Sequence, residues 1–172
     1  LLALGLGLGL SAASGFRVFV PLLGLSLAGL AGWVSLPPEA EWLGTWPASL
    51  ALGAATLLEI GGYYIPWLDN LLDGLATPLA ALAGCLLALV AFQDLPPAVR
   101  WFLAVIAGGG ASSLVQAGTV GLRGVSTGTT GGAANPLVAT AETGASLSLT
   151  LLAFLLPILA LAAALAVLGG LA

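Results

Sequence analysis

The chain has few of the residues on which most enzymes and nucleic-acid-binding proteins depend. Its 172 residues include no histidine, no lysine and only three arginines. Without histidine there can be no Ser-His or Cys-His pair and no His-Glu-x-x-His zinc motif, so we expect neither an enzyme nor a cofactor. Nucleic acid is disfavoured as a partner, because neutralising its phosphates requires clustered lysine and arginine. The single cysteine, Cys85, cannot form an internal disulfide.

Charge of either sign is also scarce. Charged residues make up 6% of the chain, against roughly 25% in an average soluble domain. A soluble fold needs polar side chains to cover its surface, and this chain has too few of them. With 60% apolar residues and a mean hydropathy of +1.16, the surface must instead be solvated by a lipid bilayer.

The apolar stretches predict an all-α membrane protein. Because a membrane-spanning helix needs about 20 apolar residues, we expect residues 1–172 to form one domain, a bundle of five or six hydrophobic helical segments. Prolines 21, 78 and 157 are expected to break or kink some of them. We expect a Gly/Thr-rich loop over 123–134. Asn135-Pro136 predicts a helix start, because asparagine can cap and proline fits the first turn. It begins a half-helix or re-entrant piece over 135–144 that leads into a span over 145–171. The expected segments are 1–31, 48–66, 74–93, 101–122 and the C-terminal pieces 135–144 and 145–171.

Two parts of the chain resemble each other. Residues 56–61 read Thr-Leu-Leu-Glu-Ile-Gly, and residues 113–118 read Ser-Leu-Val-Gln-Ala-Gly. Further along, Thr77-Pro78-Leu79 matches Asn135-Pro136-Leu137. We interpret these matches as an internal repeat of units 48–93 and 105–160, although leucine, alanine and glycine make chance matches easy. Repeats with interrupted hydrophobic segments are typical of transporters.

The polar residues inside the apolar segments lie on narrow helical stripes. A charge at the centre of a bilayer costs at least about 2.5–3.5 kcal/mol, so such residues normally face a partner or water. We therefore expect the stripes to face inward and toward one another. They consist of Ser11, Ser14 and Arg17; Thr56, Glu59 and Tyr63; Ser112, Gln116, Thr119 and Arg123; and Asn135, Glu142 and Ser146.

These stripes have two interpretations. They can hold helices together, with Arg17 paired to Glu59 or Glu142 and each bond worth about 0.6–2 kcal/mol. They can also line a path for an ion or small solute. Two carboxylates and one arginine leave an excess of negative charge, which favours a cation or a proton over an anion. On this interpretation the candidate path residues are Glu59, Glu142, Arg17, Gln116, Thr119, Asn135 and Ser14.

Our first functional hypothesis is therefore a channel or transporter for a small cation or a proton-coupled solute. The alternative is a non-transport scaffold or lipid-binding protein, in which the same residues only hold helices together. Small residues spaced four apart, such as Gly24 and Ala28, also allow a homo-oligomer.

A metal site is a separate hypothesis. Asp69, Asn70 and Asp73 follow one another closely, and their oxygens are the kind that hard cations bind. The spacing does not match a calcium-binding EF-hand loop, because Leu71 and Ala80 stand where oxygen ligands are needed. Helix capping by Asp69 is the competing interpretation.

Three stretches carry a resemblance to a known family. They are GLSAASGFRVFVPLLGL (9–25), LEIGGYYIPWLDNLLD (58–73) and TTGGAANPLVATAETG (129–144). With them the chain resembles an uncharacterised bacterial integral membrane family, domain of unknown function 4126, over nearly its whole length. The resemblance implies a small multi-pass protein of the inner (plasma) membrane. It supplies no substrate and no catalytic residues.

Overall fold

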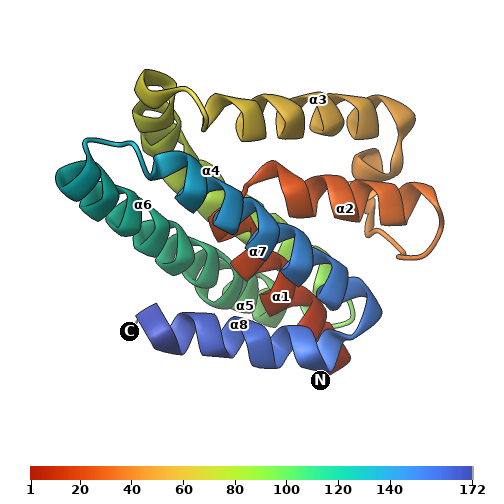
Figure 1. Ribbon diagram of the computed structural model, residues 1–172. Coiled ribbons are helices and arrows are strands. Elements are labelled where there is room, and N and C mark those ends of the chain that lie inside the picture. Colours follow the sequence, from red (N-terminus) through yellow and green to blue (C-terminus); the bar gives the residue numbers. More distant parts are fainter. Residues whose placement is uncertain (172) are drawn as a thin grey trace.

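Helices form most of the chain in the computed structural model, which describes residues 1–171 apart from the side chains of Pro66, Trp67, Asp69 and Asn70. Figure 1 shows their arrangement. The elements are α1 (Leu2–Phe16), α2 (Phe19–Leu30), the 3₁₀ helix η1 (Pro38–Gly44), α3 (Trp46–Gly62), α4 (Pro66–Ala91), α5 (Pro97–Leu103), the π-helical segment η2 (Ala104–Gly109), α6 (Gly110–Thr130), α7 (Asn135–Leu155) and α8 (Pro157–Leu171).

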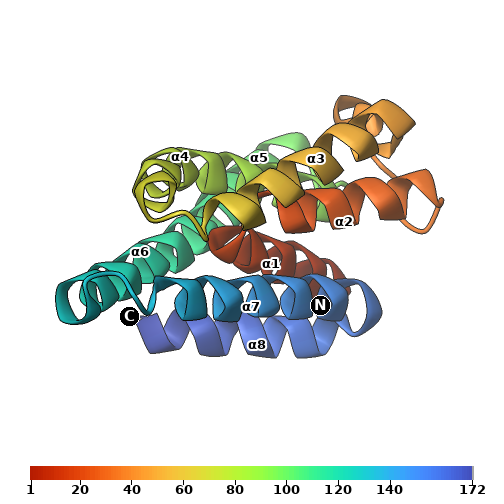
Figure 2. The same cartoon turned by 45° about the horizontal axis from the view of Figure 1, so that its top comes forward.

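The short helix α1 lies at the centre of the bundle. It packs against α4, α6, α7 and α8 (Figures 1 and 2). Glycine makes this close packing possible, because a Cβ at Gly15 would overlap the backbone of Ser112 on α6. The residues of α1 from Gly9 to Gly15 are all buried, so both its apolar and its polar residues face other helices.

The chain breaks after α1 and turns into a helical pair beside the bundle. Arg17 has an extended backbone (φ −144°, ψ 119°), which ends α1. α2 and α3 then run in opposite directions along one another, joined by η1 (Figure 1). The Thr45 side chain accepts a hydrogen bond from the Ala48 N–H at the start of α3, and Pro47 occupies a first-turn position, which fixes where this helix begins.

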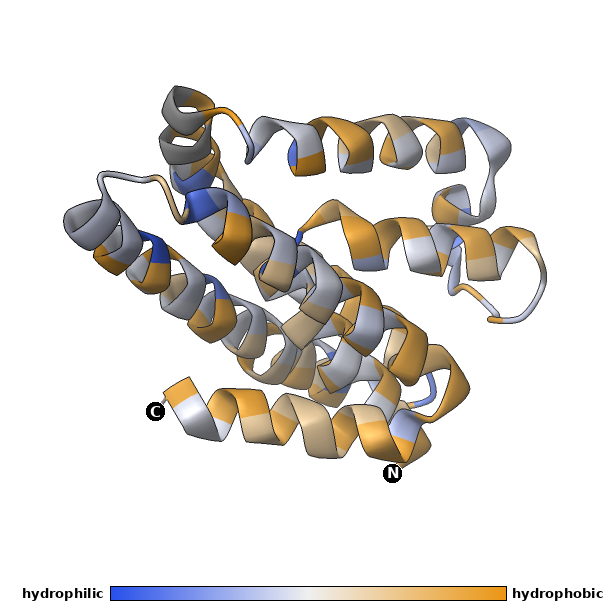
Figure 3. Ribbon diagram, in the orientation of Figure 1, coloured by the Kyte–Doolittle hydropathy of each residue, from blue (hydrophilic) through white to orange (hydrophobic). Residues whose placement is uncertain are grey.

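Three helical stretches of the described chain are long and apolar enough to cross a membrane. They are Leu71–Ala91, Pro97–Thr130 and Asn135–Leu155, and the bent pair of η1 and α3 makes a fourth if it is counted as one span. This is fewer than the five or six segments expected, because α1, α2 and α8 are apolar but only 10–17 residues long. Hydrophobic residues nevertheless recur along these helices (Figure 3), and many large ones are exposed.

The structure corrects the expectation for residues 123–134. α6 continues to Thr130, so only the turn at 131–134 lies between α6 and α7. Threonine hydroxyls in this segment donate to carbonyls one turn earlier, as Thr130 Oγ1 does to Ser126 O at 2.7 Å. Threonine is therefore compatible with a helix in this segment. The helix ends at Gly131, whose φ of 62° is a left-handed conformation that glycine adopts readily.

The expected boundary after residue 144 was also wrong. Residues 135–144 continue without interruption into the rest of α7, and the break comes at Leu156, where Pro157 begins a separate helix. The residue before a proline avoids the helical region, and Leu156 accordingly has φ −141°. α8 then turns back along α7 (Figure 2).

Pro78 differs from Pro157, because α4 runs through it without a break. The matched dipeptides of the predicted repeat are therefore not alike: Asn135-Pro136 begins a helix and Thr77-Pro78 lies inside one. The internal repeat stays a prediction.

Candidate functional site

The break between α1 and α2 places Arg17 in the interior. Its side chain is almost fully buried and extends from the end of α1 toward α7. The guanidinium donates hydrogen bonds to Phe16 O at 3.1 Å, to Ala139 O at 2.9 Å and to Thr143 Oγ1 at 3.0 Å. It also forms an ion pair with Glu142 Oε2 at 3.0 Å. Of the two partners predicted for Arg17, the structure pairs it with Glu142.

Glu59 has a different partner, the start of α2. The backbone N–H of Val18 donates to Glu59 Oε1 at 2.7 Å, and that of Phe19 donates to Oε2 at 3.0 Å. The first N–H groups of a helix have no partner within the helix and carry partial positive charge, so a carboxylate is well placed there. Glu59 thus acts from α3 as the cap of α2.

A second arginine completes the ion pairs. Arg123 on α6 forms ion pairs with Asp73 on α4 and with Glu142 on α7. Glu142 Oε2 therefore accepts from both Arg17 and Arg123. One carboxylate oxygen joins the break after α1 to α6 and α7.

The ring of Tyr63 lies against both guanidinium groups. The Arg17 Cζ atom is 4.0 Å from the ring centroid and the Arg123 Cζ atom is 4.1 Å from it. A cation over an aromatic face is attracted by the ring quadrupole, and the attraction is stronger away from water. Tyr63 therefore helps to accommodate two like charges close together.

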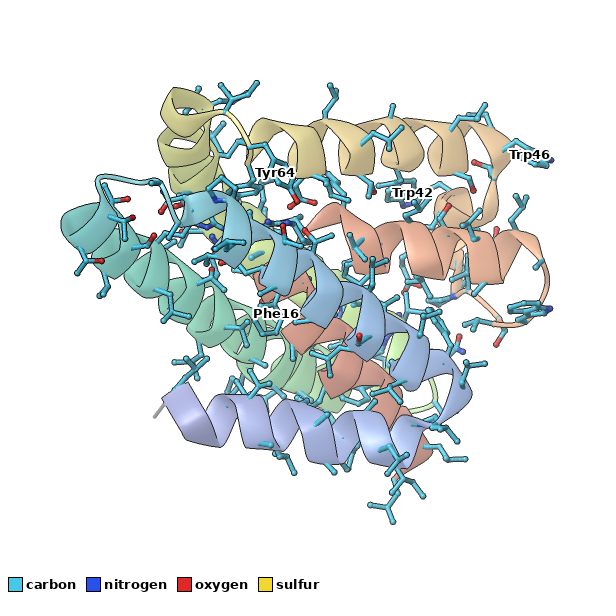
Figure 4. The ribbon with its side chains drawn as sticks, in the orientation of Figure 1. Phe16, Trp42, Trp46 and Tyr64 are labelled. Atoms are coloured by element: carbon cyan, nitrogen blue, oxygen red, sulfur yellow. The ribbon has the colours of Figure 1, made fainter. Side chains whose placement is uncertain are left out.

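We call the six residues Arg17, Glu59, Tyr63, Asp73, Arg123 and Glu142 the charge cluster. With both arginines and all three carboxylates ionised, it has a formal excess of one negative charge. Except for Asp73, whose side chain is 12% exposed, every member is buried. The polar groups meet at the end of the bundle where α4, α6 and α7 converge with α3, near the labelled Tyr64 (Figures 3 and 4).

The remaining predicted path residues are buried but bond mainly within their own helices. Ser14 Oγ donates to Ser11 O at 2.8 Å, and Thr119 Oγ1 donates to Gln116 O at 2.9 Å. Gln116 is 2% exposed, and its Nε2 has no hydrogen-bond partner among the described residues. These residues lie on the inner faces of α1 and α6, as predicted, but they form no part of the charge cluster.

Asn135 connects the start of α7 to α6. Its Nδ2 donates to Thr127 Oγ1 at 3.2 Å across the short turn. The prediction that a helix begins at Asn135-Pro136 is confirmed. Asn135 thus lies on the same helix as Glu142, about two turns before it.

The residues proposed for a metal site are only partly described. The side chains of Asp69 and Asn70 lie outside the described residues. Asp73 is within them, and it forms an ion pair with Arg123. Among the described residues no group of three or more His, Cys, Asp or Glu is placed to hold a metal ion.

Two cavities adjoin the charge cluster. A polar groove of about 490 Å³ lies between α4 and α6 and reaches Asp73 and Arg123. An apolar cavity of about 380 Å³ lies between the start of α2, α3 and α4, with Glu59 and Tyr63 in its wall. The cluster therefore has a polar approach on one side and an apolar one on the other.

Three members of the charge cluster were not among the residues predicted to line a path. Tyr63 follows Glu59 by one turn on the same stripe, and Arg123 follows Thr119 in the same way. The helical spacing was thus a sufficient signal for both. From the sequence we expected Tyr63 and Arg123 on inward-facing stripes but not among the path residues, and we assigned Asp73 to a metal site.

The apolar helices and the ionisable groups buried among them define the class, a membrane-type helical protein. The chain belongs to the family described as Domain of unknown function (DUF4126), whose model matches residues 4–172. No curated protein and no solved structure matches the chain. The family resemblance is therefore confirmed over essentially the whole chain, and the three stretches that carried it include every charge-cluster residue except Arg123.

Proposed function

We propose that the protein is a multi-pass transporter of the bacterial inner membrane that moves a small polar solute together with a proton. The observation that carries the proposal is the position of Glu142, a buried carboxylate at which the ion pairs of Arg17 and Arg123 converge. Ionisable groups inside membrane proteins are costly and are typical of solute and proton pathways.

A proton is the coupling ion that suits this cluster best. The excess of one negative charge is neutralised by a single proton. Glu142 Oε1 accepts no hydrogen bond from the described residues, so a proton can bind to this oxygen without displacing a hydrogen bond. A proton on Glu142 removes the charge that attracts both arginines. The contacts of α7 with α6 and with the end of α1 then weaken together.

The broken helix supports the same proposal. In many transporters, discontinuous helices point their N-termini at anionic groups near the substrate site. Here the N–H groups at the start of α2 face the Glu59 carboxylate. On this proposal Glu59 is a positioning residue, which holds the break where Arg17 can reach Glu142.

A small cation as the transported species has less support. A metal ion at Glu142 would meet two guanidinium groups that share one of its oxygens. A proton is far smaller than a metal ion and binds to a single carboxylate oxygen. We therefore favour proton coupling over a cation channel.

The apolar cavity favours a second function, lipid binding. Its walls include Leu58, Leu72, Leu75 and Leu79, and its volume of about 380 Å³ suits part of an acyl chain. In that case the charge cluster only holds the helices together, and the protein is a scaffold or lipid-binding protein without transport.

Proton flux separates the two functions. The purified protein is reconstituted in vesicles that contain a pH-sensitive dye, and small anionic, cationic, zwitterionic and uncharged solutes are added outside. We expect at least one solute to drive proton uptake by the wild type and none to do so with Glu142→Gln. Glu41→Gln is the matched control, because Glu41 is exposed in η1, away from the cluster.

Loss of stability must be distinguished from loss of transport. The unfolding temperature of each variant is therefore measured in the same detergent. If no solute moves protons above the level of empty vesicles, and Glu142→Gln is merely less stable, transport is wrong and the scaffold or lipid-binding function replaces it.

A further inference from the structure

The polar groove between α4 and α6 has charges of both signs in its wall. Asp73 and Thr77 come from α4, and Arg123 and Thr127 come from α6. Asp73 and Arg123 form an ion pair with each other, so the groove reaches a carboxylate and a guanidinium that are already adjacent. Both threonines are exposed and add hydroxyl groups to the same surface.

The groove lies toward the end of the bundle where α4 begins and α6 ends. Asp73 is about two turns into α4, which begins at Pro66. On α6 the groove extends from Arg123 toward the turn at 131–134, along a segment rich in threonine and glycine. The groove therefore gives a solute a way to Arg123, which is otherwise 3% exposed.

Charge balance selects the kind of solute. The cluster already has one excess negative charge, so a simple anion would increase the imbalance where the dielectric constant is low. A simple cation would have to approach Asp73 beside Arg123. A solute with one charge of each sign leaves the net charge of the cluster unchanged. Its carboxylate replaces Asp73 as the partner of Arg123, and its ammonium group replaces Arg123 as the partner of Asp73.

We propose that this groove binds a small zwitterion with one carboxylate and one ammonium group, which inserts between Asp73 and Arg123. The inference rests on the proposed function and names its substrate class. Arg123 also pairs with Glu142, so a solute on Arg123 acts directly on the carboxylate that takes the proton. Binding and protonation are thus coupled through one side chain.

The groove has room for such a solute. Its volume is about 490 Å³, within the usual range for small-molecule sites. Gly74 and Gly124 lie in its wall, and a Cβ added at either would meet no heavy atom of another element within 4 Å. A larger side chain at Gly124 can therefore fill the groove without disturbing the helices.

Gly124→Leu tests the site, and Gly121→Leu is its control. Both glycines are exposed on α6, and an added Cβ meets nothing at either position, but only Gly124 lines the groove. The shift in unfolding temperature of the purified protein is measured with glycine, β-alanine and proline as zwitterions, acetate as anion and methylammonium as cation. A ligand that binds the folded state raises this temperature.

We expect a zwitterion to raise the unfolding temperature of the wild type and of Gly121→Leu, with roughly tenfold weaker binding or none in Gly124→Leu. Acetate and methylammonium should cause no shift. The inference is overturned if no zwitterion stabilises the protein, if acetate or methylammonium does so equally, or if Gly124→Leu responds like the wild type.

The same panel in the vesicle assay separates this inference from the proposed function. Proton uptake above the level of empty vesicles that acetate or methylammonium drives, but no zwitterion does, would overturn the substrate class and leave proton-coupled transport standing. Zwitterion binding that Gly124→Leu removes, with no proton uptake for any solute, would support the groove as a binding site and overturn transport.

Discussion

Glu142 connects more elements of the interior than a single hydrogen bond between two side chains could. Its Oε2 atom accepts from two arginines that come from different elements, and the ring of Tyr63 lies within about 4 Å of both guanidiniums. In a buried ion network, removing one partner leaves the others uncompensated, which typically costs about 3–5 kcal/mol. Glu142, the two arginines and Tyr63 therefore act as a unit.

Replacing Glu59 should affect stability more than transport. Glu59→Gln keeps one oxygen acceptor but loses the charge that faces the start of α2, and hydrogen bonds to charged groups are worth about 1.5–3 kcal/mol each. We expect a loss of roughly that size in the free energy of unfolding, with proton uptake retained in the folded fraction. Flux that disappears at unchanged stability would show instead that Glu59 itself carries the proton.

Tyr63 offers a test of the two stacked guanidiniums. Tyr63→Phe keeps the aromatic face and loses only the hydroxyl, which bonds to Arg123, so it should cost about 1 kcal/mol. Tyr63→Leu removes the face from both arginines and should destabilise the protein by about 2 kcal/mol or more. Unfolding in denaturant, measured on both variants, makes the comparison. Equal losses in the two would contradict a role for the ring.

Among the elements, α4 and the π-helical segment η2 approach closely through glycine. A Cβ at Gly108 would overlap the Gly84 carbonyl and the Ala88 side chain, whereas a Cβ at Gly110 would meet nothing within 4 Å. We expect Gly108→Ala to destabilise the protein by about 1–3 kcal/mol through overpacking. Gly110→Ala should be neutral or stabilise it by up to about 1 kcal/mol. Thermal unfolding of the two variants makes the comparison. Equal stability of Gly108→Ala and Gly110→Ala would contradict the close approach of α4 and η2.

The start of α7 and the inward polar stripes could be predicted from the sequence because they depend on local features. Asn135-Pro136 is a helix-start signal, and the spacing of Gln116 and Thr119 places both on one face of α6. The extent of α6 beyond residue 122 could not be predicted, because glycine and threonine are weak helix formers that tertiary packing can override. The end of α7 at Leu155 was misplaced because a proline can either kink a helix, as we expected at Pro157, or start a new one.

The partners within the charge cluster could not be predicted, for a different reason. Glu59 bonds to the backbone of Val18 and Phe19. Backbone N–H groups become available to a distant carboxylate only where a helix breaks. Pro21, in the first turn of α2, does signal a break near Arg17, because a proline cannot bond to the carbonyl four residues earlier. It does not indicate which distant carboxylate meets the N–H groups that the break leaves unpaired.

For the whole molecule, the exposed surface predicts how the protein behaves in the cell. Large apolar side chains such as Leu57, Leu58 and Leu137 are 74–76% exposed, which a soluble monomer does not tolerate as a continuous surface. We expect the protein to stay in the membrane fraction after washing with alkaline carbonate and to be released only by detergent. Release by carbonate alone would contradict a bilayer-spanning protein.

The contact between Arg17 and Glu142 also constrains how the protein is made. Arg17 leaves the ribosome 125 residues before Glu142, which at about 5–20 residues per second is a delay of roughly 6–25 s. During this interval the Arg17 guanidinium at the end of α1 lacks the carboxylate of Glu142. We therefore expect α1 to stay near water or lipid phosphates until α7 emerges, so that the central helix is among the last to take its place.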